Sequence, residues 1–186
     1  MRTAAWIGAG LAAALLSFQG TGFCARAPKA GFELSSPDFK AEGEIPAQCS
    51  CGGKDLSPAL SWSGAPKGTR SFVLFLEDPD APLGIWIHWV VYDIPAKADG
   101  LPRALPRKRA LADGTRQGLC FGVKHFERLG YWGPCPPKGP AHHYFFRLFA
   151  LDRQLKLPPM ADKFQVQKAM KGHVLARAVL QGLFHQ

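Results

Sequence analysis

The sequence predicts a mainly β domain, and three observations support this fold class. Glycine and proline occur 20 and 16 times among 186 residues, and together they make about a fifth of the chain where about 12% is usual. This composition favours loop-rich β or α+β folds over helical bundles. Several short apolar runs are rich in β-branched and aromatic residues, as strands are. Long alternating segments of helix and strand are absent from the sequence, which argues against a doubly wound parallel fold.

Three segments carry clear strand signals. Residues 71–76 form a short apolar run between a turn and acidic residues, which predicts a buried strand. Residues 85–94 are rich in Trp, Val and Ile, and residues 143–151 carry the strongest strand signal of the chain. Residues 96–115 are basic, contain prolines and lack periodicity, so we expect an exposed excursion there.

The C-terminal part contains one helix-like segment and one ambiguous segment. In residues 161–170, apolar side chains recur at spacings that line one face of a helix. Residues 174–184 fit either a helix or a strand by their own pattern, and both interpretations stay open at this point. One domain of ordinary size accommodates all of these elements.

The first 27 residues have the layout of a secretory signal peptide. Residues 1–3 give a short positive start, residues 4–18 are apolar and uncharged, and small residues follow. We therefore predict export to the periplasm or out of the cell, with a mature domain over residues 28–186. A buried N-terminal helix or a membrane anchor is the alternative, although the apolar stretch is shorter than the ~20 residues that span a bilayer.

Two cleavage positions fit this signal. The small residues around Ala27 suit cleavage there, but Pro28 would then follow the cut, and the segment around Gly22 is the other option. The bulky Phe23 precedes Cys24, which argues against a lipid-attachment signal. Cleavage after Ala27 would remove two arginines and no acid, so the mature domain would keep a net charge of +7.

Composition excludes several other classes of protein. The net charge of +9 comes from 23 basic and 14 acidic residues, and it favours anionic partners without specifying nucleic acid. No nucleic-acid motif accompanies the basic residues 103–109, so we expect no nucleic-acid partner. An apolar share of 47% and an aromatic share of 11% exclude intrinsic disorder. No apolar run approaches 20 residues, so we expect no transmembrane segment.

The cysteines fit an oxidising compartment. Cleavage after Ala27 would leave Cys49, Cys51, Cys120 and Cys135, and four cysteines allow two disulfides in three connectivities. A bridge between Cys49 and Cys51 would close a very tight loop, so cross-pairing with the other two is favoured. A zinc site is the rival interpretation, but only one close cysteine pair is present.

Two clusters carry the chemistry. In the first, Asp78 and Asp80 alternate with two prolines directly after the first predicted strand, and His88 follows on the next. Two carboxylates in such a turn are rigidly held. The second cluster, residues 130–139, is rich in Gly and Pro and leads into residues 142–144, His-His-Tyr. A loop of this kind exposes backbone N–H groups to an anion.

Together these motifs resemble the phosphatidylethanolamine-binding protein family. The matching motifs are Asp-Pro-Asp-Ala-Pro from Asp78, Trp-x-His-Trp around His88, and Gly-Pro-Cys-Pro-Pro-x-Gly from Gly133 leading to His-x-Tyr. Residues 51–62 and 169–176 are similar too, especially to the bacterial and archaeal branch described as Raf kinase inhibitor-like. The resemblance covers about residues 32–184. It implies an antiparallel β-sandwich with a few short helices, and it makes residues 174–184 a strand.

The resemblance also implies a pocket for phosphate-like anions and phosphorylated head groups. Its residues carry over as Asp78, Asp80, His88, His142 and Tyr144, with the backbone from Gly133 to Cys135 as a wall. The histidines and the tyrosine hydroxyl can donate hydrogen bonds to an anion. We expect the carboxylates to orient the histidines and to raise their pKa values, or to accept from an ammonium group such as that of ethanolamine. We expect no cofactor and no bound metal.

Finer expectations rest on the same resemblance. The family turn after the second aspartate implies a cis Ala81–Pro82 bond, which proline allows at low cost. Cys51 and Cys135 lie in motifs near the implied pocket, so we expect a Cys51–Cys135 disulfide and, with it, one between Cys49 and Cys120. His143 stands where the family usually has arginine, and Trp132 where glycine is more common.

Two function classes remain open from the sequence. The first is an exported, non-catalytic binding or regulatory protein, with an inhibitor-like role toward an unknown protein partner, acting as a monomer or homodimer. Its ligand would be a phosphorylated small molecule or a phospholipid head group such as phosphoethanolamine. The alternative is a metal-dependent hydrolase in which Asp78, Asp80, His88 and His142 hold the metal.

Overall fold

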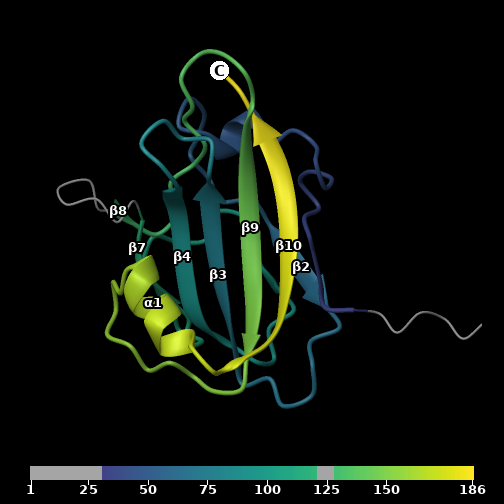
Figure 1. The fold of residues 1–186 in the computed structure, drawn as a ribbon, viewed down its shortest axis with the longest axis vertical. Helices are drawn as coiled ribbons and strands as arrows, with labels where there is room; N and C mark the ends of the chain where they lie inside the picture. The colour runs from purple at the N-terminus through teal and green to yellow at the C-terminus, as the bar shows by residue number, and fades with distance from the viewer. Residues whose placement is uncertain (1–30, 121–127) are drawn as a thin grey trace, which may run out of the picture.

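Two antiparallel sheets stack face to face, and the helix α1 covers part of the outer face of the larger sheet (Figure 1). The computed structural model describes residues 31–120 and 128–186. The architecture confirms the predicted β-sandwich. The expected signal peptide, residues 1–27, lies outside the described residues. None of the helices in the described ranges has both the length and the apolar character needed to cross a bilayer.

The larger sheet has the strand order β10-β9-β3-β4-β6, and the smaller has the order β1-β2-β5. A separate pair, β7-β8, lies beside them. The strands are β1 (Glu33–Ser35), β2 (Leu60–Ser63), β3 (Ser71–Asp78), β4 (Trp86–Pro95), β5 (Gly100–Leu101), β6 (Arg116–Gln117), β7 (Leu119–Cys120), β8 (Arg128–Leu129), β9 (His142–Leu151) and β10 (Val174–Phe184).

The predicted strands agree with the observed ones within two residues at each end. β3 reads as a continuous apolar run because both of its faces are covered, one by the smaller sheet and one by the α1 side. The expectation of an exposed excursion over residues 96–115 is wrong in part. β5 pairs with β2 inside this segment, and Leu101 and Leu105 are buried against the core between the sheets.

The helix α1 (Lys163–Met170) begins two residues later than predicted, because Asp162 caps it. The Asp162 carboxylate accepts from the backbone N–H of Gln165 at 2.8 Å, and the Gln165 side chain accepts from the backbone N–H of Asp162 at 3.0 Å. This reciprocal arrangement satisfies two N–H groups that a helix start leaves unpaired. Val166 and Met170 then point at the sheet and are buried.

Alternation along the strands divides the apolar side chains into two cores. Leu74 and Leu76 of β3 face the smaller sheet, together with Trp89 of β4. Val73 and Phe75 point the opposite way, toward α1. Neighbouring residues on a strand face opposite sides of the sheet, so one strand supplies both cores.

The two cysteine predictions have opposite outcomes. The Cys51–Cys135 disulfide is confirmed, with the Cα atoms 5.4 Å apart. The Cys49–Cys120 bridge is wrong, because both thiols are free and buried. Cys49 packs in the core between the sheets, whereas the Cys120 thiol donates to the backbone oxygen of Arg128 across the β7-β8 pair. Burial raises the pKa of Cys49 to about 11 and that of Cys120 to about 12.

The predicted cis Ala81–Pro82 bond is also wrong, since the described residues contain no cis peptide bond. The turn between β3 and β4 is made by other means. The N–H of Gly84 donates to the carbonyl of Ala81 at 3.1 Å, and Gly84 takes a φ of 99° that glycine adopts without strain.

Removing the disulfide should lower the free energy of unfolding by about 2–4 kcal/mol, because the crosslink joins residues 84 positions apart and restricts the unfolded chain. The variant is Cys51→Ser/Cys135→Ser, compared with wild type by urea unfolding under non-reducing conditions. Cys120→Ser is the matched control, since it alters a buried thiol that crosslinks nothing. An equal midpoint and slope for the double variant and wild type would contradict the expectation.

Candidate functional site

The ends of three neighbouring strands lie side by side at one end of the larger sheet (Figure 1). β3 ends there, and its antiparallel neighbours β4 and β9 begin there. This end of the sheet therefore brings together Asp78 from the end of β3, His88 from the start of β4 and His142 from the start of β9. The sequence separates these side chains by up to 64 positions, and only the strand order places them side by side.

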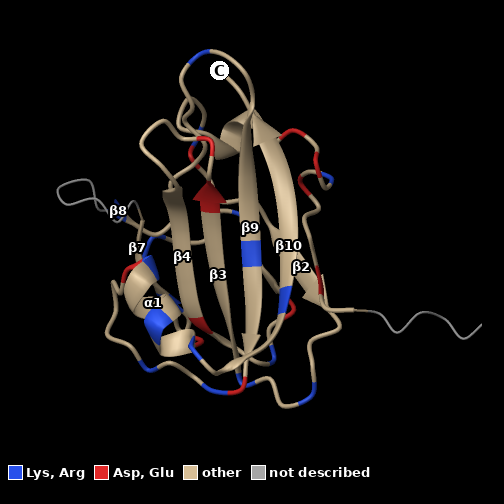
Figure 2. Ribbon diagram, viewed as in Figure 1, with Lys and Arg blue, Asp and Glu red and all other residues tan. Residues whose placement is uncertain are grey.

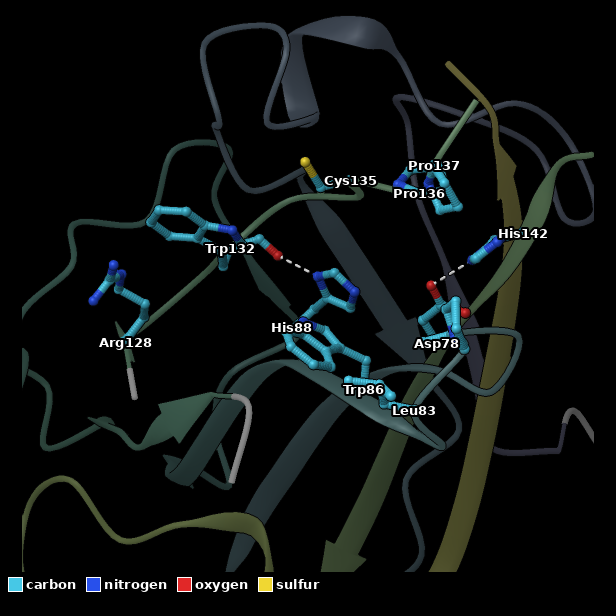
Figure 3. A pocket seen from close by; sticks show the side chains of 12 residues that line it. Asp78, Leu83, Trp86, His88, Arg128, Trp132, Cys135, Pro136, Pro137 and His142 are labelled. Atoms are coloured by element: carbon cyan, nitrogen blue, oxygen red, sulfur yellow. Dashed lines mark hydrogen bonds and ion pairs between the residues drawn. The ribbon is translucent and has the colours of Figure 1, made fainter. Parts of the chain in front are cut away.

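A cavity of about 510 Å³ opens at this end of the sheet. Its wall is mostly apolar and aromatic, with a few polar groups. The lining residues are Asp78, Ala81, Pro82, Leu83, Trp86, His88, Arg128, Trp132, Cys135, Pro136, Pro137 and His142. Figure 3 shows them around the opening. Four predicted site residues are in this set, namely Asp78, His88, Cys135 and His142, whereas Asp80, Gly133 and Tyr144 are not.

The buried Asp78 and the partly buried His142 form a pair at one end of the cavity (Figure 3). Nδ1 of His142 donates to the Asp78 carboxylate at 2.8 Å, because an ionised carboxylate only accepts. Asp78 is 3% exposed. The bond fixes the orientation of the imidazole ring and compensates the buried carboxylate. This is the orienting role that the sequence predicts for Asp78.

His88 is joined to the cavity wall by two hydrogen bonds with Trp132. Its Nδ1 donates to the Trp132 carbonyl at 2.8 Å, and the Trp132 N–H donates to the His88 carbonyl at 2.9 Å. A carbonyl only accepts, so Nδ1 carries a proton. These two bonds fix the position of the His88 ring relative to the part of the cavity wall that contains Trp132.

The expectation that carboxylates raise the histidine pKa values is wrong for His88. Its side chain is 3% exposed, and burial lowers its pKa because the charged ring loses its hydration. The Trp132 carbonyl and the Asp78 charge act in the opposite direction but do not outweigh burial. His88 is therefore a neutral ring at neutral pH.

Tyr144 lies beneath the cavity rather than on its surface. The residue is fully buried, and its ring meets the His88 ring edge-on at 5.3 Å and stacks on the His142 ring at 6.5 Å between centroids. The hydroxyl makes no hydrogen bond with the described part of the chain. Burial raises its pKa far above the ordinary value, and the nearby Asp78 charge adds to this. Tyr144 thus keeps its proton as a donor.

Asp80 holds the turn instead of lining the cavity. Its carboxylate accepts from the backbone N–H of His143 at 2.8 Å and from Nδ1 of His143 at 2.6 Å. These bonds lower the pKa of Asp80, the backbone bond first. His143, the residue that replaces the usual arginine, therefore ties β9 to the turn after β3.

The loop of residues 132–137, which forms one wall of the cavity, is held by contacts on its side away from the cavity. The N–H of Gly133 donates to the Asp55 carboxylate at 2.7 Å, and the N–H of Cys51 donates to the Pro134 carbonyl at 3.0 Å. A Cβ on Gly133 would lie 2.0 Å from the Cys49 carbonyl oxygen, so this position requires glycine. The Gly133 N–H is thus used inside the protein, and Gly133 supports the cavity wall from the side away from the ligand.

Sequence reasoning singled out Trp132 as a departure from the family pattern but missed Trp86 and Arg128 as residues that line the cavity. Trp86 and Trp132 form much of its wall, and the guanidinium of Arg128 lies 5.4 Å from the Trp132 ring centroid. The motif Trp-x-His-Trp could have indicated Trp86, since it precedes the site histidine by two positions on one strand face. Arg128 belongs to no motif, and its place follows only from the β7-β8 pair.

Among residues 31–120 and 128–186, no three His, Cys, Asp or Glu side chains are grouped as metal ligands. Asp78 and His142 already bind each other, and Asp80 is turned toward His143. No observation in the described ranges therefore favours the metal-dependent hydrolase.

Comparison with known proteins gives consistent results. The sequence model of the family described as "Phosphatidylethanolamine-binding protein" matches residues 35–185. A protein of Aquifex aeolicus named "UPF0098 protein" is 45% identical over 154 residues, which are 82% of this chain and 87% of that protein. "Putative lipoprotein LppC" of Mycobacterium tuberculosis is 37% identical over 153 residues, which are 81% of this chain and 71% of that protein. The crystal structure of E. coli YbcL, described as a new member of the mammalian PEBP family, has a TM-score of 0.76 and 32% identity, covering 84% of this chain and 99% of that one.

The depressed pKa of His88 predicts a loss of stability in acid. Above the ordinary histidine pKa of about 6.5, the ring is neutral in both the folded and the unfolded states, so it adds no pH dependence. Below it, the unfolded chain takes up the proton first, and stability falls as the pH falls. For one proton, the free energy of unfolding falls by at most about 1.4 kcal/mol per pH unit. His88→Asn, which keeps a donor for the Trp132 carbonyl, should lose less stability than wild type between pH 7.5 and pH 5.5 in urea unfolding. Identical losses in the two proteins would contradict this assignment.

Proposed function

Because the chain belongs to the phosphatidylethanolamine-binding protein family, we propose that it is an exported binding protein whose cavity takes a phosphate-like anion or a phosphorylated head group such as phosphoethanolamine. One observation carries the proposal. The Asp78–His142 pair and the His88 ring line a cavity whose other walls are mostly apolar, and the buried Tyr144 ring lies beneath them. Such a concave, largely apolar site with a few convergent polar groups is typical of small-ligand sites.

The donors suit a single anionic group. Tyr144 keeps its hydroxyl proton beneath the cavity and close to Asp78, and His142 is oriented by Asp78. Nδ1 of His142 is used by Asp78, so this ring donates to a phosphate oxygen through Nε2 when both ring nitrogens carry a proton, and a hydrogen bond to a charged group is worth roughly 1.5–3 kcal/mol. The apolar wall strengthens these bonds, because it keeps water from the ligand.

The acceptors suit a zwitterion. Asp78 is the buried carboxylate of the site, and one of its oxygens binds His142. An ammonium group at a short distance from a phosphate, as in phosphoethanolamine, would find an acceptor at Asp78. A polyanion would meet this carboxylate unfavourably. The proposed ligand is therefore a phosphomonoester or a zwitterionic head group.

We propose binding without catalysis, in an exported compartment. The signal-like residues 1–27 and the Cys51–Cys135 disulfide support export, because disulfides persist in oxidising compartments. The M. tuberculosis relative is named "Putative lipoprotein LppC", and a lipoprotein belongs to the cell envelope. N-terminal sequencing of the protein from its host envelope fraction would test the removal of residues 1–27.

Replacing His142 should weaken the binding of phosphoethanolamine about tenfold or more. The expected loss corresponds to one charge-assisted hydrogen bond, and about 1.4 kcal/mol is one decade of affinity. The experiment is calorimetric titration of phosphoethanolamine into wild type and His142→Ala, with a chelator present. His173→Ala is the matched control, because His173 forms a similar pair with Asp152 at 2.9 Å, outside the cavity. Equal affinity of wild type and a folded His142→Ala would overturn the site.

The binding should also weaken as the pH rises. His88 is neutral at neutral pH because of burial, and a bound anion would favour its charged form, so binding takes up protons. Titrations of wild type at pH 6 and pH 8 should show tighter binding at the lower value. In His88→Asn the part of this difference that comes from His88 should disappear, and an unchanged difference would assign the proton uptake elsewhere.

A further inference from the structure

The loop between β3 and β4 exposes two large apolar side chains beside the cavity. Leu83 is 90% exposed and Ile85 is 58% exposed. In the described part of the chain, Leu83 is the most exposed of the large apolar residues. It also lines the cavity, so the exposed apolar surface begins at the mouth and continues outward.

This loop is held in place, so its apolar tip has a fixed position. The Gly84 N–H closes a turn onto the Ala81 carbonyl at 3.1 Å, and this turn presents Leu83 near its tip. The base of the loop is fixed by Asp80, whose N–H donates to Asp78 and whose carboxylate binds His143. A tip that is held this way keeps Leu83 in water, which is unfavourable unless another apolar phase covers it.

The remainder of the rim has the composition of a membrane interface. Trp86 and Trp132 lie on the cavity wall, and Pro136 and Pro137 face Leu83 across the opening (Figure 3). Tryptophan favours the head-group level of bilayers because one part of its ring is apolar and its N–H is polar.

Positive charge accompanies this apolar rim. Arg128 lines the cavity and Lys138 directly follows its prolines, and both are exposed. The nearest exposed acid of the loop, Asp80, is paired with His143. Without residues 1–27 the chain keeps a net charge of +7, which complements an anionic lipid surface. Figure 2 shows Lys and Arg distributed over the whole described molecule.

We propose that this rim is a membrane-docking surface. Its side chains Leu83 and Ile85 insert into the leaflet of a phospholipid bilayer that faces the protein. The proposal rests on the proposed head-group site, because docking would turn the cavity mouth toward lipid head groups. Apolar side chains that insert beside basic residues give reversible binding at the interface, not a transmembrane anchor. The protein would thus reach a head group while its lipid stays in the bilayer.

Vesicle binding tests the proposal. Sedimentation with vesicles of phosphatidylethanolamine and phosphatidylglycerol should retain wild type, and brominated lipids should quench its tryptophan fluorescence. Ile85→Ser should lower the partition severalfold, and Leu83→Ser/Ile85→Ser should lower it about tenfold or more. Phe164→Ser is the matched control, because Phe164 is 67% exposed on α1, does not line the cavity and should leave the partition unchanged.

Calorimetry with soluble phosphoethanolamine separates this proposal from the proposed function. Ile85 does not line the cavity, so Ile85→Ser should keep the wild-type affinity for the soluble ligand while it loses vesicle binding. His142→Ala should show the reverse. If His142→Ala loses nothing but Ile85→Ser loses vesicle binding, the head-group site fails and the docking surface stands. Wild-type partition by the Leu83→Ser/Ile85→Ser variant would overturn the docking surface. A wild-type dimer that the same double variant abolishes would also overturn it, since a second copy would then cover the loop.

Discussion

The reciprocal hydrogen bonds between His88 and Trp132 join the central sheet to the loop that makes the cavity wall. The sheet side of the site rests on β4, which lies between β3 and β6. His88 itself sits at a register shift in the β3-β4 pairing, between Ile87 and Trp89, which pair with Glu77 and Leu76. The loop side has no regular structure of its own, so these two bonds transfer the position of the strand to the wall. The contacts of Gly133 with Asp55 and of Pro134 with Cys51 then hold the wall from behind.

Burial, more than the pairing of charges, determines how the site is ionised. Asp78 is almost fully buried and keeps a partner in His142, whereas His88 is buried with a carbonyl partner and therefore stays neutral. Tyr144 is buried without a partner and stays protonated. The neutral His88 ring offers a ligand only Nε2, as an acceptor, because Trp132 uses its Nδ1–H, whereas Tyr144 keeps its hydroxyl proton.

Local pattern predicted the strands well because the apolar runs of β3, β4 and β9 are long enough to identify buried strands by themselves. The 174–184 segment was ambiguous by pattern, and only the family resemblance identified β10. Asp78 and His142 were correctly placed in one cavity, because each stands at a strand end that the resemblance aligns.

The remaining errors concern tertiary contacts, which no local pattern contains. Nothing in the sequence indicates that Cys49 faces the core between the sheets while Cys120 bonds to Arg128 across a small hairpin. The loop around Gly133 was interpreted as a wall that presents N–H groups to a ligand. Glycine is required at position 133 for another reason, because the Cys49 carbonyl lies too close for any side chain. The apolar rim was missed because Leu83 and Ile85 stand between two motifs as ordinary apolar residues, and only their exposed fractions in the fold distinguish them.

The crosslink between Cys51 and Cys135 has a consequence for the maturation of the protein. Cys135 is itself a wall residue of the cavity, and Cys51 belongs to the segment that supports the wall from behind. Oxidation of the two thiols therefore adds a covalent link to a wall that hydrogen bonds already hold. Chains whose thiols are still reduced would keep the sheet, its histidines and these hydrogen bonds but lack that link, so the wall would gain its full rigidity together with oxidative folding.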